Sequence, residues 1–401
     1  RGISLNKLKR YKEATSDFNL VIKHKPENIK AYNNLGNVYK NLSKFNEAIN
    51  AYNKAISINR YFLEAISNKA DALQSQKKFD EALIELNKIY SKNPKFLNLN
   101  YKIVSNKMSI FDWDTFDNIT NSIKDKILKK EIIFDPLFIY YLFDDPELHQ
   151  INSENFINNE FKNYEKIIFN KKRKLNKKIK IGYFCGDYHD HPVLHIMSNI
   201  FKNHNKDNFE IYAFSHGINK KNNIWLEDVF QSFKKFYDIN EMTDDDIVKL
   251  VNSENIDIAV NLTGLTERSR TSIFYNKIAP IQINYLGFPG TIGLKFMDYI
   301  IADKIVIPEN QKKYYTEKVC YLPTCYIPNA NNIAIKDKNK NFSRAEFGLP
   351  QNEIVFCAFH NPHKINPAIF DCWMNIIKKI EGSVIWIKSD TEKGKNNLIN
   401  E

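Results

Sequence analysis

The stretch IKIGYFCGDYHDHPVLHIM, residues 179–197, decides the fold, because an apolar run precedes a polar turn and a helical pattern. Tyr183 and Phe184 belong to the apolar run, Gly186 interrupts it, and Pro192 stands where the first residue of a helix is expected. Apolar residues then recur at helical spacing: Val193, Ile196, Met197, Ile200 and Phe201. A buried strand, a turn and a helix in this order predict an α/β domain, which holds its ligands at the carboxyl ends of its strands.

The predicted turn places Asp187, His189, Asp190 and His191 at the N-terminus of the predicted helix. The positive end of a helix dipole disfavours imidazolium, so a histidine at this point is expected to stay neutral and able to accept a proton. The turn is therefore a candidate catalytic site. Zinc binding is the alternative chemistry, because three histidines, 189, 191 and 195, lie close to a cysteine at 185.

Length and charge limit the class of protein. The 401 residues allow two or three domains, and a hydrophobic fraction of 43% is ordinary for a globular protein. The net charge of +11 is carried by 51 Lys and only 7 Arg, and the lysines are scattered along the chain, so nucleic acid is not expected as a partner. The densest basic run, residues 171–180, is interpreted as a solvated linker.

Cysteine usage and hydropathy bear on the compartment. Five cysteines without a CxxC pair argue against a disulfide framework and favour a reducing cytoplasm. No apolar stretch approaches the roughly 18 residues of a membrane helix, so no membrane partner is expected.

The first hundred residues repeat with a period of 34. At this offset small residues align, an aromatic or Leu follows four residues later, and Pro ends the second helix, which is the tetratricopeptide pattern. The aligned sets are Gly2, Gly36 and Ala70; Ala14, Ala48 and Ala82; Phe18, Tyr52 and Leu86; and Pro26 with Pro94. We expect about three repeats over residues 1–94, the first of them incomplete, and a helical adaptor over residues 95–178.

Asn34 and Asn68 also share the 34-residue offset. Asn side chains at one-repeat intervals on the concave face of a solenoid can pair with the backbone of an extended peptide, so these two residues are candidate peptide-binding positions. In a chain so rich in Asn, coincidence is the alternative explanation.

Strand and helix patterns alternate after residue 179. Strands are predicted at 209–214, 256–262, 281–285 and 299–302, and helices at 224–233 and 244–251. Alternation of this kind predicts a mainly parallel sheet covered on both faces.

Two polar loops follow these strands and are candidate ligand-binding loops. The first holds Asn261, Thr263, Gly264 and Thr266, and the second reads YLGFPGTIG from residue 285 to 293. Glycines at this density either let a ligand approach backbone amides or form tight turns.

A second α/β unit is expected from about Phe347. Strands are predicted at 354–359 and 384–387, and a helix begins at Asn366 and Pro367. Lys364 lies between the first strand and this helix, where an ammonium group and helix amides attract a diphosphate. Two strands and one helix cannot bury themselves, so this unit is expected to be incomplete.

Taken in order, the repeats and the motifs GYFCGDYHDHPVLHIM, NLTGLTERSR, IAPIQINYLGFPGTIG, FMDYIIAD, YTEKVCYLP and FGLPQNEIVFCAFHNPHKINP resemble the O-linked N-acetylglucosamine transferases of glycosyltransferase family 41, including SPINDLY-type members. The resemblance implies a GT-B fold, with a first Rossmann-like lobe at residues 179–330 and a truncated second lobe at residues 331–401. It also implies inverting transfer of N-acetylglucosamine from UDP-N-acetylglucosamine to Ser or Thr hydroxyls of proteins.

The resemblance implies roles for individual residues. His191 matches the active-site histidine and Asp187 the carboxylate four residues before it; Lys364 matches the lysine that steadies the donor diphosphate. The implied donor and substrate contacts are Asn361, Leu286, Gly287, Pro289, Gly290, Thr291, Asn261 and Thr266. Asn34 and Asn68 match the asparagine ladder of the solenoid. No cofactor or metal is implied, which also speaks against zinc at the histidines.

Departures from the family pattern keep rival functions open. Asn261 stands where many relatives carry Asp, and Leu265 where Tyr or His is common. One rival is protein O-fucosylation from GDP-fucose; the other is a non-catalytic tetratricopeptide scaffold, against which Asp187, His191 and Lys364 argue together. Because the family's main uridine contacts come later than Glu401, residues 1–401 alone are not expected to turn over donor.

Overall fold

The computed structural model describes residues 1–7, 10–93, 99–165, 177–217, 224–266, 268–328 and 342–401. These residues form two compact units. The first unit is Arg1–Asp125 with Asn339–Glu401, and the second is Lys126–Lys338. Each unit has hydrophobic clusters of its own.

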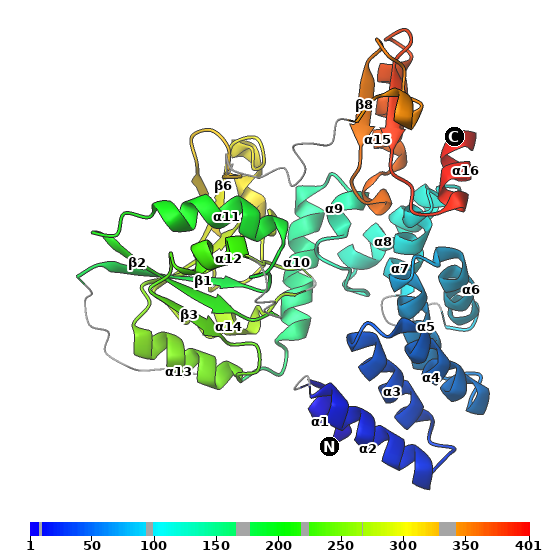
Figure 1. The fold of residues 1–401 in the computed structure, drawn as a ribbon, viewed down its shortest axis with the longest axis horizontal. Coiled ribbons are helices and arrows are strands. Elements are labelled where there is room, and N and C mark those ends of the chain that lie inside the picture. The colour runs from blue at the N-terminus through cyan, green and yellow to red at the C-terminus, as the bar shows by residue number, and fades with distance from the viewer. Residues whose placement is uncertain (8–9, 94–98, 166–176, 218–223, 267, 329–341) are drawn as a thin grey trace. The chain divides into compact units, whose positions relative to one another are not determined.

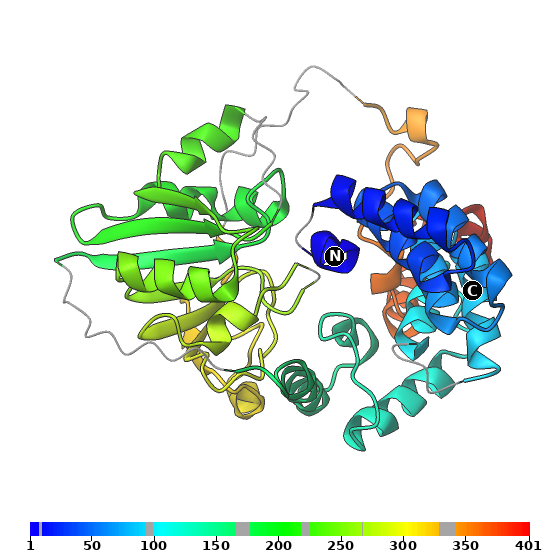
Figure 2. The same ribbon diagram turned by 90° about the horizontal axis from the view of Figure 1, so that it is seen from below.

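The first unit begins with antiparallel helix pairs that stack side by side, drawn in blue in Figures 1 and 2. The helices are α1 (Gly2–Lys7), α2 (Tyr11–His24), α3 (Ile29–Asn41), α4 (Phe45–Ile58), α5 (Leu63–Ser75) and α6 (Phe79–Tyr90). Helix α5 begins 34 residues after α3, and α6 begins 34 residues after α4. Ala14, Ala48 and Ala82 are fully buried where helices cross, as their spacing predicts. The predicted repeats are confirmed.

The helices after the repeats are divided between the two units. Helix α7 (Leu99–Ser109) packs on α6 in the first unit. Helices α9 (Ile139–Leu142) and α10 (Pro146–Glu160) belong to the second unit, and α8 (Phe116–Leu128) includes the point of division. Asp145 caps α10 by accepting a hydrogen bond from the amide of Leu148, and Pro146 takes the first helical position.

The second unit is built on a seven-stranded sheet in which every pairing is parallel. The strands are β1 (Ile179–Cys185), β2 (Phe209–Ser215), β3 (Lys235–Asp238), β4 (Ile258–Asn261), β5 (Ile281–Tyr285), β6 (Tyr299–Ala302) and β7 (Lys318–Tyr321). Their order is β3-β2-β1-β4-β5-β6-β7, so the chain reverses its direction of travel across the sheet between β1 and β4. A parallel sheet binds ligands beyond the carboxyl ends of its strands at such a switch point.

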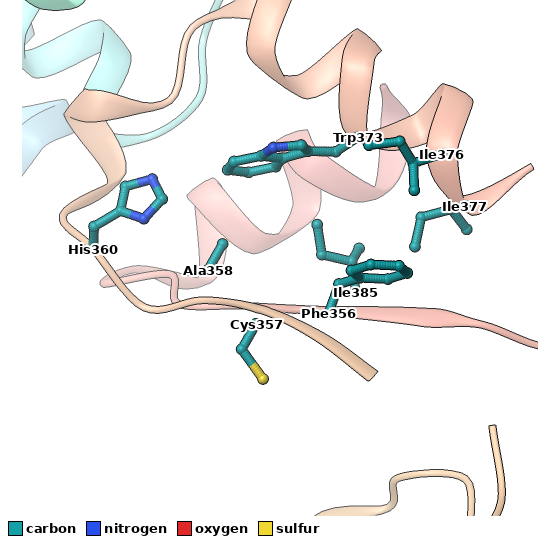
Figure 3. A pocket seen from close by; sticks show the side chains of 8 residues that line it. All are labelled: Phe356, Cys357, Ala358, His360, Trp373, Ile376, Ile377 and Ile385. Carbon is teal, nitrogen blue, oxygen red and sulfur yellow. The ribbon is translucent and has the colours of Figure 1, made fainter. Parts of the chain in front are cut away.

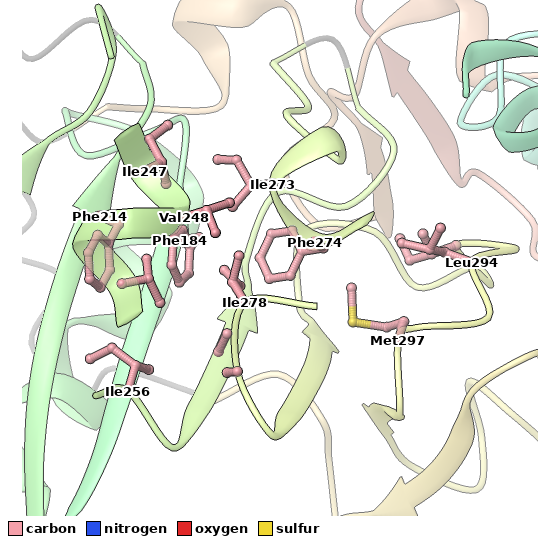
Figure 4. Close-up of a cluster of buried hydrophobic side chains, with 14 of the residues drawn as sticks. Phe184, Phe214, Ile247, Val248, Ile256, Ile273, Phe274, Ile278, Leu294 and Met297 are labelled. Carbon is pink, nitrogen blue, oxygen red and sulfur yellow. The ribbon is translucent and has the colours of Figure 1, made fainter. Parts of the chain in front are cut away.

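Helices cover both faces of this sheet (Figure 1). Phe184 of β1 points to one face, where it joins α13 (Asp244–Glu254) and α14 (Ser272–Tyr275) in the cluster of Figure 4. Tyr183 points to the other face and packs with α11 (Pro192–Asn203) and α12 (Ile224–Phe230). The near-continuous apolar run of β1 is thus explained by burial on both sides.

Some predicted boundaries were wrong. The helix predicted to reach Phe233 ends at Phe230, and the strand predicted from Ile256 begins at Ile258. Asn255 explains the later start, because it adopts a left-handed conformation (φ 56°) that closes α13. The edge strands β3 and β7 were not predicted, since each has four residues and none of them is buried.

The α/β segment predicted from about Phe347 belongs to the first compact unit. It consists of a parallel strand pair, β8 (Val355–Ala358) and β9 (Val384–Ile387), with α15 (Pro367–Ile377). Helix α16 (Glu392–Asn400), which was not predicted, lies beside the segment that follows α7 (Figure 1), and Asn397 donates a hydrogen bond to the carbonyl of Ile110. As expected, the pair does not bury itself. A cavity of about 240 Å³ remains between sheet and helix (Figure 3). Its lining is Phe356, Cys357, Ala358, His360, Trp373, Ile376, Ile377 and Ile385.

Two general features complete the description. All five cysteines are free thiols. Within the residues that the structure describes, no helix combines the length and the apolar character needed to cross a membrane.

Candidate active site

The predicted turn after β1 and the first predicted ligand loop, which follows β4, meet at the switch point of the sheet. Phe184 is paired with Asn261 across β1 and β4, so the segments after these strands start side by side. The amide of Gly186 donates a 3.0 Å hydrogen bond to Oγ1 of Thr263, which ties one loop to the other. The buried side chain of Asn261 accepts hydrogen bonds from the amides of Thr263 and Gly264, both at 3.1 Å. Asn261, which was predicted to contact the substrate, therefore stabilises the conformation of the loop in which it lies.

His191 caps helix α11, and Pro192 occupies the first helical position, as the sequence predicts. Nδ1 of His191 accepts a 3.3 Å hydrogen bond from the amide of Val193. Burial lowers the pKa of His191, the positive charge of Arg268 lowers it further, and Asp187 opposes both. A neutral ring whose Nδ1 lone pair is engaged carries its hydrogen on Nε2. Burial thus favours the neutral form of His191, and in this conformation the neutral ring donates through Nε2 and can accept a proton only by giving up the cap.

The side chain of Asp187 lies close to Arg268 and to two histidines of the turn, His189 and His191. Asp187 is 7% exposed, and its Oδ1 accepts a 2.8 Å hydrogen bond from Nη1 of Arg268. Nε2 of His189 lies 3.4 Å from Oδ1, and Nδ1 of His191 lies 3.9 Å from Oδ2. Of the predicted catalytic residues Asp187, His191 and Lys364, the structure places Asp187 and His191 next to each other.

Arg268 was missed by the sequence analysis. It lies in the loop after β4, in the quoted motif NLTGLTERSR, and is one of only 7 Arg in a chain with 51 Lys. A carboxylate that directly follows a buried strand is stabilised by a nearby cation, and an Arg in another loop of the same predicted sheet was the available signal.

The histidines of the turn do not converge on one point. His195 pairs with Asp190, with 2.7 Å between Nε2 and Oδ1, whereas His189 faces Asp187. Burial raises the pKa of Cys185 to about 12, so it is a thiol rather than a thiolate ligand. Across the described ranges, no three His, Cys, Asp or Glu side chains are grouped so as to hold a metal ion.

The glycine-rich loop after β5 packs tightly against protein. A Cβ atom on Gly287 would lie 2.1 Å from the carbonyl oxygen of Leu262, and one on Gly290 would lie 2.1 Å from the hydroxyl of Tyr140. The carbonyl of Pro289 accepts a hydrogen bond from the hydroxyl of Tyr315. Close packing against protein atoms, which is neither of the two explanations drawn from the sequence, requires glycine at Gly287 and Gly290.

The remaining residues expected near a substrate have mixed surroundings. Leu286 is 9% exposed and packs in the cluster under α11, although its φ is +72°. Thr291 is buried and donates to Glu317, and Thr266 is half-buried with its carbonyl accepting from the amide of Ser269. Leu286 and Thr291 therefore contribute to the structure of the loop itself.

Asn361 and Lys364 belong to the first unit, whereas Asp187 and His191 belong to the second. Lys364 ends the short 3-10 helix η3 (Pro362–Lys364) and Asn361 directly precedes it; the amide of Lys364 donates a 3.0 Å hydrogen bond to the carbonyl of Asn361. Burial, with a contribution from Lys364, lowers the pKa of the neighbouring His363 to about 4. Lys364 thus stands beside a neutral histidine and just before α15.

The solenoid pairs asparagines across repeats. Nδ2 of Asn68 donates a 2.9 Å hydrogen bond to Oδ1 of Asn33, so the direct partner of Asn68 is Asn33 rather than Asn34. Asn34 is half-buried on α3. Nζ of Lys102 continues the polar series with a 2.6 Å hydrogen bond to Ser67.

Comparison with known families places the chain. The model of "Glycosyl transferase family 41" matches residues 159–341 and 328–401, more than half of the chain, and a tetratricopeptide model matches residues 29–62. The chain belongs to glycosyl transferase family 41. The resemblance expected from the motifs is thereby confirmed.

Relatives of this family 41 chain are known from plants and animals. It is 35% identical over 214 residues to an Arabidopsis thaliana protein named "Probable UDP-N-acetylglucosamine--peptide N-acetylglucosaminyltransferase SEC", covering 53% of this chain and 22% of the relative. It is 25% identical over 213 residues to the SPINDLY protein of Solanum lycopersicum, covering 52% and 22%. The chain thus spans about a fifth of the length of these relatives.

The fold has a solved counterpart. A mutant of the Thermobaculum terrenum O-GlcNAc transferase superposes with a TM-score of 0.65 at 16% identity, covering 100% of this chain and 69% of that one. This chain and that structure thus share a fold of helical repeats followed by a parallel α/β sheet, and the predicted GT-B class is confirmed.

Proposed function

We propose that the full-length protein transfers N-acetylglucosamine from UDP-N-acetylglucosamine to Ser or Thr hydroxyls of proteins, with inversion at the sugar. One observation carries the proposal: a neutral histidine, His191, caps a helix beside the buried carboxylate of Asp187 at the switch point of a parallel sheet. Membership of family 41 supports the reaction class.

The reaction requires a proton acceptor and support for the leaving group. The acceptor oxygen attacks the anomeric carbon, the bond from that carbon to the diphosphate oxygen breaks, and the hydroxyl proton is lost. The Nε2 hydrogen of His191 can orient the acceptor or a sugar oxygen, while Oδ2 of Asp187 retains lone pairs that receive the proton directly or through water. Lys364, just before α15, is suited to neutralise the diphosphate, so the chemistry asks for no metal.

Protein acceptors are the proposed partners, held by the polar face of the solenoid that includes Asn34 and Asn68. The 2.9 Å bond from Nδ2 of Asn68 to Asn33 supports this proposal, because it orients the Asn68 amide, which carries a second N–H and a carbonyl oxygen with which a peptide backbone can pair. Replacement of both Asn34 and Asn68 by Ala is expected to raise KM for a protein acceptor and to leave KM for the donor unchanged.

Transfer of labelled N-acetylglucosamine to protein by the full-length enzyme tests the proposal. We expect His191→Ala and Lys364→Ala each to lower kcat by about a hundredfold or more. Stabilisation against heat by UDP but not by GDP is expected; stabilisation by GDP together with transfer from GDP-fucose would replace the proposed donor. Transfer undiminished in both variants would refute the assigned site. Residues 1–401 by themselves are expected to show no turnover above the Lys364→Ala background.

A further inference from the structure

Arg268 joins two segments that are far apart in sequence. Its Nη1 donates to Oδ1 of Asp187 at 2.8 Å and also contacts Nε2 of His189, so one guanidinium nitrogen bridges a carboxylate and an imidazole. The two loops are held together independently, because the amide of Gly186 donates to Thr263. A Cβ on Gly186 would lie 3.0 Å from the Cβ of Arg268, so the stem of Arg268 lies against the turn.

Arg268 is the cationic partner of the buried carboxylate of Asp187. The side chain of Asp187 is 10% exposed, and a carboxylate so far from water is costly unless a cation pairs with it. Within the described part of the chain, Arg268 is the one permanently charged group in ion-pair contact with Asp187; the other contacts are His189 and His191.

The bridge also assigns the hydrogens of the site. A guanidinium has donors only, so Nε2 of His189 must accept, and the hydrogen of its neutral ring is on Nδ1. Oδ1 of Asp187 pairs with Arg268, while Oδ2 faces His191.

We propose that Arg268 is a positioning residue for the transfer reaction. By bridging Asp187 and His189 it holds Oδ2 of Asp187 toward His191 and fixes the conformation of the turn at residues 186–191. The proposal rests on the proposed function. It follows from the contacts between the loops after β1 and β4.

The charges around His191 predict a pH signature. The groups that influence it are Asp187, His189, Arg268 and His195, the last of which pairs with Asp190. Loss of the guanidinium removes a positive charge that lowers the pKa of His191. It also leaves the negative charge of Asp187, which raises that pKa, without the opposing charge of Arg268. Both changes act in the same direction, so the pKa of His191 rises when Arg268 is replaced by a neutral residue.

The test uses Arg268→Met, Arg268→Lys and, as a matched control, Arg270→Met in the full-length protein. Arg270 lies in the same loop but pairs with Asp244 and donates to the carbonyls of Ile239 and Met242. The pKa of His191 is measured by deuterium exchange at the imidazole C2 position with mass spectrometry, and kcat and KM are measured in parallel. The exchange measurement does not depend on transfer activity.

We expect Arg268→Met to raise the pKa of His191 and to lower kcat about tenfold to a hundredfold, with KM for the donor changed by less than about threefold. Arg268→Lys should restore the pKa but only part of kcat, because an ammonium group lacks the fork that bridges two partners. Arg270→Met should lower the unfolding midpoint and leave the pKa of His191 unchanged.

A folded Arg268→Met variant with a wild-type His191 pKa would overturn the proposal. If that variant does not fold, as judged by circular dichroism, Arg268→Lys decides: full wild-type kcat would show that the bridge is not required. Absence of transfer in every form, wild type included, would refute the proposed function and leave the shift in the pKa of His191 as the measure of the bridge.

Discussion

The buried carboxylate of Glu317 accepts a 2.7 Å hydrogen bond from the hydroxyl of Thr291. Its other oxygen accepts from the amide of Ile292, also at 2.7 Å, and Thr316 adds a further donor. One side chain just before β7 therefore holds the end of the glycine-rich loop after β5. The loop that the sequence offers as a ligand site is held in place from a distant part of the chain.

Two replacements of Glu317 should distinguish the effect of its hydrogen bonds to Thr291 and Ile292 from the effect of its charge. We expect Glu317→Ala to lower the free energy of unfolding by about 2–4 kcal/mol, because buried donors on Thr291 and Ile292 lose their acceptor. Glu317→Gln keeps an acceptor and the volume, and should cost about 1 kcal/mol. Urea unfolding of both variants measures the difference; equal losses would mean that the hydrogen bonds to Glu317 do not hold the loop.

The pH dependence of the same variants follows from burial, which raises the pKa of Glu317. A raised pKa in the folded state means that the native protein binds this proton more tightly than the unfolded chain does. The stability from this group is complete below the ordinary glutamate pKa and is lost as pH rises through the folded value. Over that interval, wild type should lose more stability with rising pH than Glu317→Gln; parallel curves would contradict the assignment.

His191 has two separable tasks, capping helix α11 and serving the reaction. His191→Asn keeps a capping acceptor, so it should stay within about 0.5 kcal/mol of wild type, whereas His191→Ala should lose about 1 kcal/mol. Both variants should lose transfer activity, because neither side chain replaces the Nε2 donor. Thermal unfolding and activity are measured on the same samples; retained activity in His191→Asn would show that only the cap matters.

His363 predicts acid sensitivity in the first unit. Burial lowers the pKa of His363 to about 4, so the folded state binds this proton more weakly than the unfolded chain does. The stability from the neutral ring is present above the ordinary histidine pKa and is lost as pH falls from about 6.5 to about 4, by about 2–3 kcal/mol. Urea unfolding at several pH values should give a flatter profile for His363→Gln; an unchanged slope would exclude His363 as the cause.

Trp113 anchors the β8–β9 unit on the helices that follow the repeats. It packs against Phe370 with 5.4 Å between ring centroids, in a cluster with Phe111 and Ile365. We expect Trp113→Ala to cost about 3–5 kcal/mol and to speed amide exchange in β8 and β9 more than in the repeats. Asp80→Asn breaks the exposed contact with Lys393 and is the control, with a cost of about 0.5 kcal/mol or less. Equal exchange in both variants would contradict anchoring by Trp113.

Much of the fold could be predicted because its signals are local. The 34-residue period, the apolar run before Gly186 and the Thr243 and Asn366 caps each report on contacts within a few turns of chain, and the structure bears them out. The edge strands β3 and β7 could not be predicted, because their side chains are only partly covered and leave no apolar run. The pairing of Asn68 with Asn33 depends on how adjacent repeats turn against each other, which spacing alone does not determine.

The turn at residues 186–191 combines features that the local sequence determines with contacts that depend on the tertiary structure. The sequence by itself determined that Asp187 and His191 stand at the start of a helix behind a buried strand, since burial and helix capping act over a few residues. Only the tertiary structure decided that Arg268 pairs with Asp187 and that the amide of Gly186 donates to Thr263. The two contacts join residues that are 81 and 77 apart in the chain. The order of the strands makes the pairing possible, because it sets the loops after β1 and β4 side by side.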